Sequence, residues 1–404
     1  MGKHGLDHNV SSCSTNKSFF EPGKRIRKIV HTTVNDNRKG FRMNIEKIDK
    51  NFKQAKIGDT ELHFYDATKA PFSLEGFPWR KEDETGFFRL PRTLTKNEVN
   101  EGALYLCNHT TGGAIRFRSN SNIIAIRAKL KDSSDMNHMP RAGSAGFDLY
   151  RGGCGKKAIH FGTAQPCRDQ EILEVIMANT NDNTTYDWIV NMPLYGGAET
   201  VEIGIAPGAI LEAPTPHKIK KPILFYGSSI TQGGCASRPG NCYSSMLCRT
   251  LDAPQVNLGF SGSGRGEPAV AKAIAELDLA AFVMDYDHNA PSVEHLKATH
   301  ENFFRIIREA HPELPIIIMS KCDIWPEVND ANLLANIQRR DIIETTYRNA
   351  KKSGDKNVYF IDGATLFGRK NRWDCTVDRC HPNDLGFYRM YKNVLPVLKE
   401  AIKK

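Results

Sequence analysis

The chain has 404 residues, of which 40% are hydrophobic and 25% are charged, a composition typical of a globular protein with room for more than one core. No run of about 18 apolar residues occurs, which excludes a transmembrane helix. The N-terminus lacks the apolar segment of a secretory signal. We therefore expect a cytoplasmic protein that does not bind membranes, with its ten cysteines reduced.

The positive charge is concentrated at the N-terminus. Residues 1–42 hold nine Lys and Arg against three Asp and Glu, so this segment supplies two thirds of the net charge of +9. A basic arm can bind nucleic acid, but no nucleic-acid-binding fold is recognisable after it. We therefore expect residues 1–42 to be a solvated, disordered extension, and we expect no nucleic-acid partner.

The next part of the chain, residues 43–212, has the pattern of an all-β domain. Short segments alternate apolar and polar residues, and glycine- and asparagine-rich turns separate them. Many short strands with little helical periodicity indicate a β-sandwich or jelly roll. The expected strands cover residues 61–65, 103–107, 114–118, 123–127, 146–150 and 200–205.

A proline- and lysine-rich stretch follows the β domain. Four prolines fall within residues 206–222, and three lysines cluster just before the last of them. Prolines and charge in this density are typical of a connector between domains. We expect a linker over residues 213–222.

From residue 223 to 404 the pattern changes to alternating strands and helices. The expected strands are 223–226, 255–258, 281–284, 315–319 and 358–361, and the expected helices are 241–251, 266–277, 293–310, 333–352 and 385–402. This alternation predicts an α/β domain with a parallel sheet covered by helices on both faces. Ligands of such sheets bind beyond the carboxyl ends of the strands.

Polar residues follow four of these expected strands. Gly227-Ser-Ser229 ends the first strand, and a glycine-rich loop around Gly262 follows the second. Asn289 follows the third strand, and the sequence Asp378-x-x-His381 precedes the last helix. Because these segments converge on one edge of the sheet, the sequence predicts the parts of a serine hydrolase.

Each residue type suits that chemistry. A serine hydroxyl becomes a nucleophile when an imidazole accepts its proton, and a carboxylate bonded to the other ring nitrogen orients that imidazole. Ser229, His381 and Asp378 are the candidates for these roles. The oxyanion of acyl transfer needs fixed donors, each contributing on the order of 3 kcal/mol. The candidate donors are the N–H groups of Ser229 and Gly262 and the side chain of Asn289.

At this point the sequence resembles the SGNH, or GDSL-type, hydrolases. The resemblance covers about residues 220–404 and follows the family's order of four motifs. It implies that the parallel sheet is flavodoxin-like. It implies that Ser229 is the nucleophile, with Ser228 in place of the family's usual Asp, and that Gly262 ends the motif N-x-x-x-x-G that starts at Asn257. It also implies that Asn289 belongs to the third motif and that Asp378 and His381 form the fourth.

The β domain resembles the sandwich that precedes the hydrolase domain in one SGNH subgroup. The motif that carries this resemblance is G-x-D-L-Y, which is Gly146-Phe-Asp-Leu-Tyr150 in this chain. Resemblance implies a fused esterase of the carbohydrate acetylesterase type, in which the sandwich contributes loops to the rim of the active site.

Several residues keep a second interpretation. Ser229 alone could be a turn residue, Asp384 lies near enough to compete with Asp378, and Asn289 could cap the helix near residue 293. His288 and Trp325 are candidates for the substrate pocket. We expect His288 to line the pocket or to pack rather than to replace His381, and Trp325 could equally pack between the domains.

The cysteines carry a further set of alternatives. Cys235 and Cys242 follow the nucleophile closely, but a thiol nucleophile would need its own imidazole, so we expect both to be structural. Cys375, Cys380 and His381 have no second ligand pair with zinc spacing. We therefore expect no metal and no organic cofactor.

These features predict a two-domain serine esterase that hydrolyses short acyl esters through an acyl-enzyme. From the resemblance, the substrate is an acetylated sugar or oligosaccharide. Two alternatives remain, a lipid or acyl thioester hydrolase with the same chemistry and a non-catalytic carbohydrate-binding protein. The sequence leaves open whether the protein forms homo-oligomers.

Overall fold

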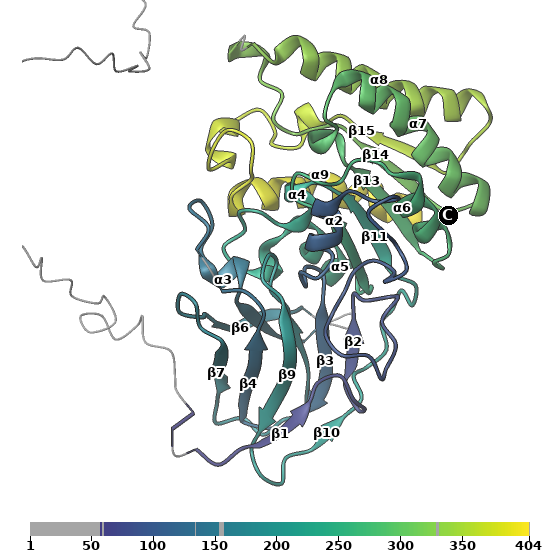
Figure 1. Ribbon diagram of the computed structural model, residues 1–404. Helices are drawn as coiled ribbons and strands as arrows, with labels where there is room; N and C mark the ends of the chain where they lie inside the picture. The colour runs from purple at the N-terminus through teal and green to yellow at the C-terminus, as the bar shows by residue number, and fades with distance from the viewer. Residues whose placement is uncertain (1–56, 59, 134, 153–156, 329–330, 404) are drawn as a thin grey trace, which may run out of the picture. The chain divides into compact units, whose positions relative to one another are not determined.

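The computed structural model describes residues 57–403 apart from 59, 134, 153–156, 329 and 330 (Figure 1). The expected basic extension and the first residues of the expected β domain lie outside the described residues. Within the described part of the chain, the strands form two antiparallel sheets and one parallel sheet.

The two antiparallel sheets form the β-sandwich. The first has the order β1 (His63–Asp66), β9 (Ala198–Ile205), β4 (Ile123–Leu130), β7 (Ile172–Asn179). The second has the order β10 (Leu211–Glu212), β3 (Ala114–Ser119), β8 (Tyr186–Asn191), β5 (Phe147–Arg151), β6 (Ile159–Ala164), and β2 (Ser73–Glu75) also pairs with β3. Alternate residues of both sheets face one shared core, which includes Phe117, Ile126, Leu149, Trp188 and Ile203.

One expected strand in this region is wrong. Residues 103–106 belong to the helix α2 (Glu101–Leu106) and Cys107 is its C-cap, although the segment Ala-Leu-Tyr-Leu-Cys alternates like a strand. The side chain of Asn100 accepts a hydrogen bond from the Ala103 N–H, and Glu101 occupies the first turn. An Asn cap followed by an acidic residue favours a helix start, and this local signal outweighs the alternation. A second short helix, α3 (Arg141–Ser144), precedes β5.

The parallel sheet agrees closely with the sequence-based expectation. Its strand order is β12 (Gln255–Gly259), β11 (Ile223–Gly227), β13 (Ala281–Asp285), β14 (Ile316–Met319), β15 (Val358–Ile361). This is the flavodoxin-like order, in which the first strand lies between the second and the third. The helices are α4 (Ser229–Gln232), α5 (Tyr243–Leu251), α6 (Pro268–Ala275), α7 (Val293–Ala310), α8 (Leu333–Lys352) and α9 (Asp384–Lys403).

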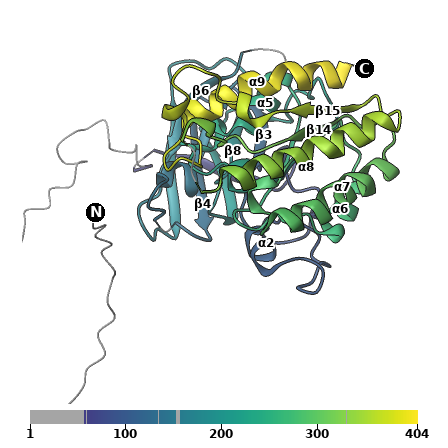
Figure 2. The same ribbon diagram turned by 90° about the horizontal axis from the view of Figure 1, so that it is seen from above.

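Helices cover both faces of the parallel sheet. Figure 2 shows α5 and α9 on one side of β14 and β15, and α6, α7 and α8 on the other. Successive strand residues point to opposite faces, so Phe225 and Val283 join the core beneath α5 and α9. Tyr226 and Met284 join the core beneath α6 and α7.

The order of the strands places a crevice at the end of β11. The chain leaves β11 towards β12 on one side and returns to β13 on the other, so loops from both neighbours border the carboxyl end of β11. A crevice of this kind is the usual ligand site of an open α/β sheet. Ser229 stands at this point.

The connector between the two regions is tied to both of them. His217 bonds Asp252 at 2.8 Å and Glu75 at 3.0 Å, and Thr215 bonds Asp187 at 2.8 Å. The expected linker over residues 213–222 remains a proposal, but the residues within it make fixed contacts. None of the helices in the described residues has the length and apolar character needed to cross a membrane.

Candidate active site

The turn after β11 holds Ser229 at the start of a helix. Ser229 is the first residue of α4, where backbone N–H groups have no partner within the helix. Ser228 is fully buried, and its hydroxyl accepts a hydrogen bond of 3.2 Å from the Ile230 N–H. Ser and Asp are equally good helix caps. Ser228 therefore keeps the capping role that an Asp would have at this position.

Only glycine fits at the end of β11. A Cβ on Gly227 would lie 2.1 Å from the Thr231 hydroxyl oxygen and 2.4 Å from the carbonyl oxygen of Asp285. This close packing brings α4 directly against the end of the sheet. Ser229 is thereby fixed at the crevice, and the residue is 7% exposed.

Ser229, His381 and Asp378 form a continuous chain of hydrogen bonds. The Ser229 Oγ lies 2.9 Å from His381 Nε2, and His381 Nδ1 lies 2.7 Å from Asp378 Oδ2. The other carboxylate oxygen of Asp378 accepts hydrogen bonds from the N–H groups of Cys380 and His381. Partial burial raises the pKa of Asp378, but these hydrogen bonds and the His381 ring outweigh it and lower the pKa overall. Asp378 is therefore a carboxylate at neutral pH.

Asp384, the alternative orienting acid, is engaged elsewhere. Its carboxylate accepts hydrogen bonds from the N–H and hydroxyl of Ser237 at 2.9 and 2.5 Å, and from Asn241 Nδ2 at 2.9 Å. These contacts hold the segment after α4. The carboxylate that reaches His381 is Asp378.

The loop after β12 carries Gly262 next to the nucleophile turn. Gln232, in α4, accepts a hydrogen bond of 2.9 Å from the Ser261 N–H and so ties the loop to the helix. Gly262 has a φ of +66° and open space beside its Cα. A positive φ favours glycine, and the open side leaves its backbone accessible to a ligand. Its predicted role as an oxyanion donor stays a prediction.

The side chain of Asn289 is oriented by the same loop. Its Oδ1 accepts a hydrogen bond of 3.3 Å from the Gly264 N–H, which leaves the amide NH₂ as a donor. Asn289 lies in the 3₁₀-helix η3 (Asp287–Asn289) and does not cap α7. The cap of α7 is Ser292, whose side chain accepts from the His295 N–H. The alternative interpretation of Asn289 as a helix cap is therefore wrong.

The two candidate pocket residues are both largely buried. His288 has a carboxylate partner that its sequence neighbours did not reveal, since His288 Nε2 lies 2.9 Å from Asp323 Oδ1. Trp325 is 4% exposed, stacks on Phe367 and donates from Nε1 to the Arg379 carbonyl. The exposed indole of this cluster belongs to Trp373, in the 3₁₀-helix η6 (Arg372–Cys375). Trp325 thus presents little surface to a ligand.

The cysteines near the nucleophile are protonated thiols. Burial, with the nearby Asp378 charge, raises the pKa of Cys235 to about 12. Burial also raises the pKa of Cys242. Among the described residues, Cys375, Cys380 and His381 do not gather as one group of metal ligands. Two other groups do, namely His138, Asp378 and His381, and His288, Asp323 and Cys380.

Side chains of the sandwich region donate hydrogen bonds to the backbone of the site. The sequence analysis did not predict these contacts. The fully buried Arg89 donates to the carbonyls of Asn257 and Gly259 at 2.8 and 3.0 Å, at the end of β12. The Tyr195 hydroxyl donates to the Ser229 carbonyl at 3.3 Å. Since the partners are far apart in the sequence, no local pattern could have indicated these contacts.

The G-x-D-L-Y motif joins the sandwich to the segment after α4. The carboxylate of Asp148, which is fully buried, accepts hydrogen bonds from Arg238 Nη1 and from the Gly240 N–H, both at 2.8 Å. Arg238 also donates to the Tyr150 hydroxyl at 2.5 Å. The motif therefore holds the sandwich against the segment that follows α4.

Together, a flavodoxin-like sheet and a Ser–His–Asp chain at its switch point define a class of α/β hydrolase. Residues 220–399 match the GDSL-like lipase/acylhydrolase family, and residues 62–211 match the N-terminus of SGNH hydrolase-type esterases, known as GxDLY. The chain belongs to this family of SGNH, or GDSL-type, hydrolases, and it is a carboxylic ester hydrolase.

Solved structures share the same fold. A GDSL-like lipase from Bacteroides ovatus is 28% identical, with a TM-score of 0.75 over 85% of this chain and 98% of its own. The salicylyl-acyltransferase SsfX3 of a tetracycline biosynthetic pathway is 20% identical, with a TM-score of 0.68 over 82% and 95%. A family two carbohydrate esterase from Cellvibrio japonicus is 11% identical, with a TM-score of 0.54 over 85% and 98%. Among curated proteins, no sequence match was found.

Proposed function

We propose that this esterase removes short acyl groups, above all O-acetyl groups, from carbohydrates, with Ser229 as the nucleophile. The observation that carries the proposal is the hydrogen-bonded chain from Ser229 Oγ through His381 to Asp378, at 2.9 and 2.7 Å. This geometry suits proton transfer from the serine to a correctly oriented imidazole.

The reaction would proceed in two halves. Ser229 Oγ attacks the ester carbonyl carbon while its proton passes to His381 Nε2. The oxyanion accepts hydrogen bonds from the N–H groups of Ser229 and Gly262 and from the Asn289 amide. His381 then protonates the departing sugar oxygen, which leaves an acetyl-serine. Water attacks this ester, again with His381 as the base, and acetate and free Ser229 result.

Two observations support a carbohydrate as the alcohol part of the ester. The Cellvibrio japonicus neighbour is a carbohydrate esterase, and another neighbour, from Clostridium thermocellum, is a family two carbohydrate esterase in complex with cellohexaose. In this chain Trp373 is 50% exposed, and its indole packs on that of Trp325 at 4.8 Å between ring centroids. An exposed indole offers a flat apolar face on which a sugar ring can stack.

Trp373 lies beside the loop that carries Asp378 and His381. The Asn383 side chain donates to the Asp374 carbonyl at 2.7 Å, and the Asn383 N–H donates to the Cys375 carbonyl at 2.9 Å. These bonds close the loop between η6 and α9. A sugar on the indole would therefore lie next to the proposed catalytic residues.

The direct test is NMR of a mixture of acetylated xylo- and manno-oligosaccharides during digestion. We expect release of acetate, and we expect Trp373→Ala to raise KM for the oligosaccharides while leaving p-nitrophenyl acetate hydrolysis little changed. A preference for acyl chains longer than about eight carbons would favour the lipid or thioester alternative instead. Equal rates for the wild-type protein and Ser229→Ala on p-nitrophenyl acetate would refute the serine mechanism.

A further inference from the structure

His138 reaches the candidate active site from the sandwich region. It lies between β4 and α3, and its neighbour Met139 is buried in the core beneath α5 and α9. Further along the chain, Gly143 in α3 packs so tightly that an added Cβ would lie 2.2 Å from the Ala236 carbonyl oxygen. These contacts fix the segment against the region that follows the nucleophile.

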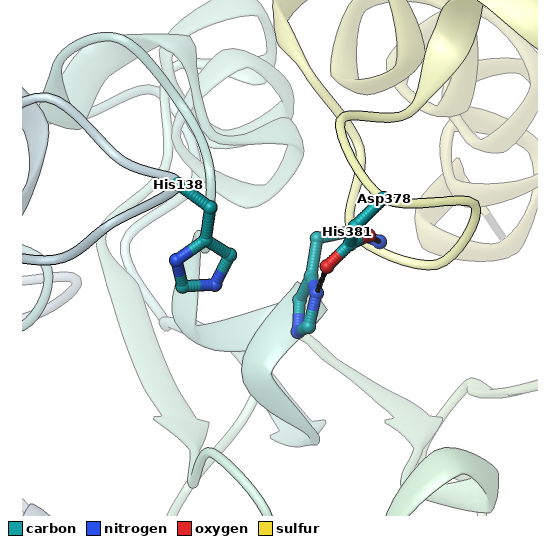
Figure 3. Close-up of side chains that lie close together, drawn as sticks. All are labelled: His138, Asp378 and His381. Atoms are coloured by element: carbon teal, nitrogen blue, oxygen red, sulfur yellow. Dashed lines mark hydrogen bonds and ion pairs between the residues drawn. The ribbon is translucent and has the colours of Figure 1, made fainter.

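The His138 ring lies against the ring of His381. Figure 3 shows the two imidazoles beside one another, with the Asp378 carboxylate bonded to His381. The ring centroids are 5.3 Å apart and the ring planes meet at 79°. One possible ligand atom from each of His138, Asp378 and His381 lies within 4.8 Å of the other two.

The distances between these side chains are close to those between the ligands of a bound metal ion. With Zn–N bonds of about 2.0–2.1 Å, two imidazoles on one tetrahedral ion have ring centroids about 5 Å apart and ligand atoms about 3.3 Å apart. The observed centroid spacing already meets the first condition. A shift of about 1.5 Å in the ligand atoms, within reach of side-chain rotation, would meet the second.

The His138 ring is free to make that shift. Its Nδ1 is shielded from solvent and has no hydrogen-bond partner among the described residues. A buried polar atom without a hydrogen-bond partner is unfavourable, so coordination of an ion by this ring would relieve that unfavourable state. No hydrogen bond of Nδ1 would have to be broken for the ring to turn.

We propose that His138, Asp378 and His381 form an inhibitory binding site for Zn²⁺. Two imidazoles and a carboxylate form a ligand set that zinc favours, whereas Mg²⁺ prefers oxygen ligands. The bound ion inhibits ester hydrolysis because catalysis in the metal-free site needs both ring nitrogens of His381. Nε2 accepts the serine proton and Nδ1 bonds Asp378, so coordination of either nitrogen disables the base.

The second group of metal-binding residue types is less suited to a cation. His288, Asp323 and Cys380 already include a His–Asp pair at 2.9 Å, and Lys321 Nζ lies 3.5 Å from the same Asp323 oxygen. Burial also raises the pKa of the Cys380 thiol to about 12. A neighbouring ammonium group and a protonated thiol both oppose zinc, so this group serves as the competing site in the test.

Binding is tested by calorimetric titration of Zn²⁺ into the untagged Ser229→Ala protein, so the result does not depend on ester hydrolysis. We expect Ser229→Ala/His138→Phe, which keeps a ring at this position, to lose one site or to bind at least tenfold more weakly. The matched control is Ser229→Ala/His160→Phe, since His160 is an exposed histidine of β6 that bonds Thr163. Identical isotherms for the His138 variant and its parent would overturn the proposal, and so would loss of the site in Ser229→Ala/Cys380→Ser.

Inhibition is tested with p-nitrophenyl acetate, and each variant's rate is normalised to its own metal-free rate. This part alone rests on the proposed function. We expect Zn²⁺ to inhibit the wild-type protein, EDTA to restore its activity, Mg²⁺ to have no effect, and His138→Phe to need at least tenfold more Zn²⁺ for half inhibition. Equal zinc sensitivity of the two proteins would overturn the proposal. If the protein hydrolyses no ester at all, the proposed function fails while the calorimetric result still decides the site.

Discussion

The side chain of Asn289 is oriented by the bond between its Oδ1 and the Gly264 N–H, and its NH₂ group remains as a donor. If this group binds the oxyanion, Asn289→Ala removes an interaction that forms mainly in the transition state. We expect kcat to fall about 10²–10³-fold with little change in KM. Asn120→Ala is a suitable control, because Asn120 lies in the sandwich region, where its Oδ1 accepts a hydrogen bond from the Ile210 N–H. A higher KM with an unchanged kcat would contradict the proposed role.

The two neighbouring carboxylates Asp378 and Asp384 allow a matched comparison. Asp378 bonds the His381 ring, whereas Asp384 bonds Ser237 and Asn241. We expect Asp378→Asn to lower kcat at least tenfold without a large loss of stability, because it removes the charge that orients and stabilises the imidazolium. Asp384→Asn should mainly lower the melting temperature. Steady-state kinetics and thermal unfolding of both variants test this, and the reverse pattern would assign the orienting role to Asp384.

The residues of the candidate site could be proposed from the sequence because each follows the end of a strand and a turn. Ser229, Gly262, Asn289 and His381 could be placed in this way, since parallel strands bring their carboxyl ends to one edge. Residues that act on the site from a distance could not be found. Arg89 and His138 reach it only through tertiary contacts with partners more than 150 residues away.

At the scale of elements, the strength of the local pattern decided what the sequence could predict. Helices α7 (Val293–Ala310) and α8 (Leu333–Lys352) were predicted with their observed bounds, and the five strands of the parallel sheet were predicted to within a residue. Their long apolar periodicity and buried strands carry strong signals. Helix α2 has only 6 residues, so its alternation imitates a strand and only the Asn100 cap distinguishes it.

The end of β13 places a buried acid beneath the nucleophile helix. Asp285 accepts hydrogen bonds from Thr231 and Tyr243, both at 3.2 Å, and burial raises its pKa from 3.8 to about 7. Between pH 4 and pH 7 the folded protein therefore binds a proton that the unfolded chain has released. The contribution of this group to stability is fully present below pH 4, declines as the pH rises, and is lost above pH 7.

This behaviour predicts the effect of Asp285→Asn. Because the amide does not titrate, the variant should lose less stability than the wild-type protein between pH 5 and pH 8, by about 3 kcal/mol. Urea unfolding at both pH values measures the difference between the two proteins, so contributions from other titrating groups cancel. Equal losses of stability in the two proteins between pH 5 and pH 8 would show that Asp285 is ionised throughout this pH range.

At the scale of the whole molecule, the sandwich and the parallel sheet share buried polar contacts. Asp148 is fully buried and binds Arg238 and the Gly240 N–H across the boundary between them. We expect Asp148→Ala to destabilise the protein by about 3–5 kcal/mol, because it leaves Arg238 without its buried partner. Glu174→Ala removes the exposed ion pair with Arg127 and should cost less than about 1 kcal/mol. Denaturant unfolding of both variants makes the comparison, and equal losses would mean that the motif has no special structural role.

The two regions also share their hydrophobic cores. Met139, Leu194 and Tyr195 of the sandwich region belong to the core beneath α5 and α9, and Leu90, Val99 and Leu106 belong to the core beneath α6 and α7. Each face of the parallel sheet is thus completed by side chains from the preceding part of the chain. Removing them would expose apolar surface, at about 25 cal/mol for each Å².

Shared cores and buried hydrogen bonds between the two regions predict that the sandwich and the hydrolase region unfold together. Independent domains give separate heat-absorption peaks, whereas regions that complete one another's cores lose stability in a single cooperative step. We expect differential scanning calorimetry of the full chain to give one transition, which Asp148→Ala shifts to lower temperature without splitting. Two resolved peaks in the wild-type protein would contradict this, because they would mean that the hydrolase region stays folded after the sandwich has lost Arg89, Tyr195 and His138 from their places beside the active site.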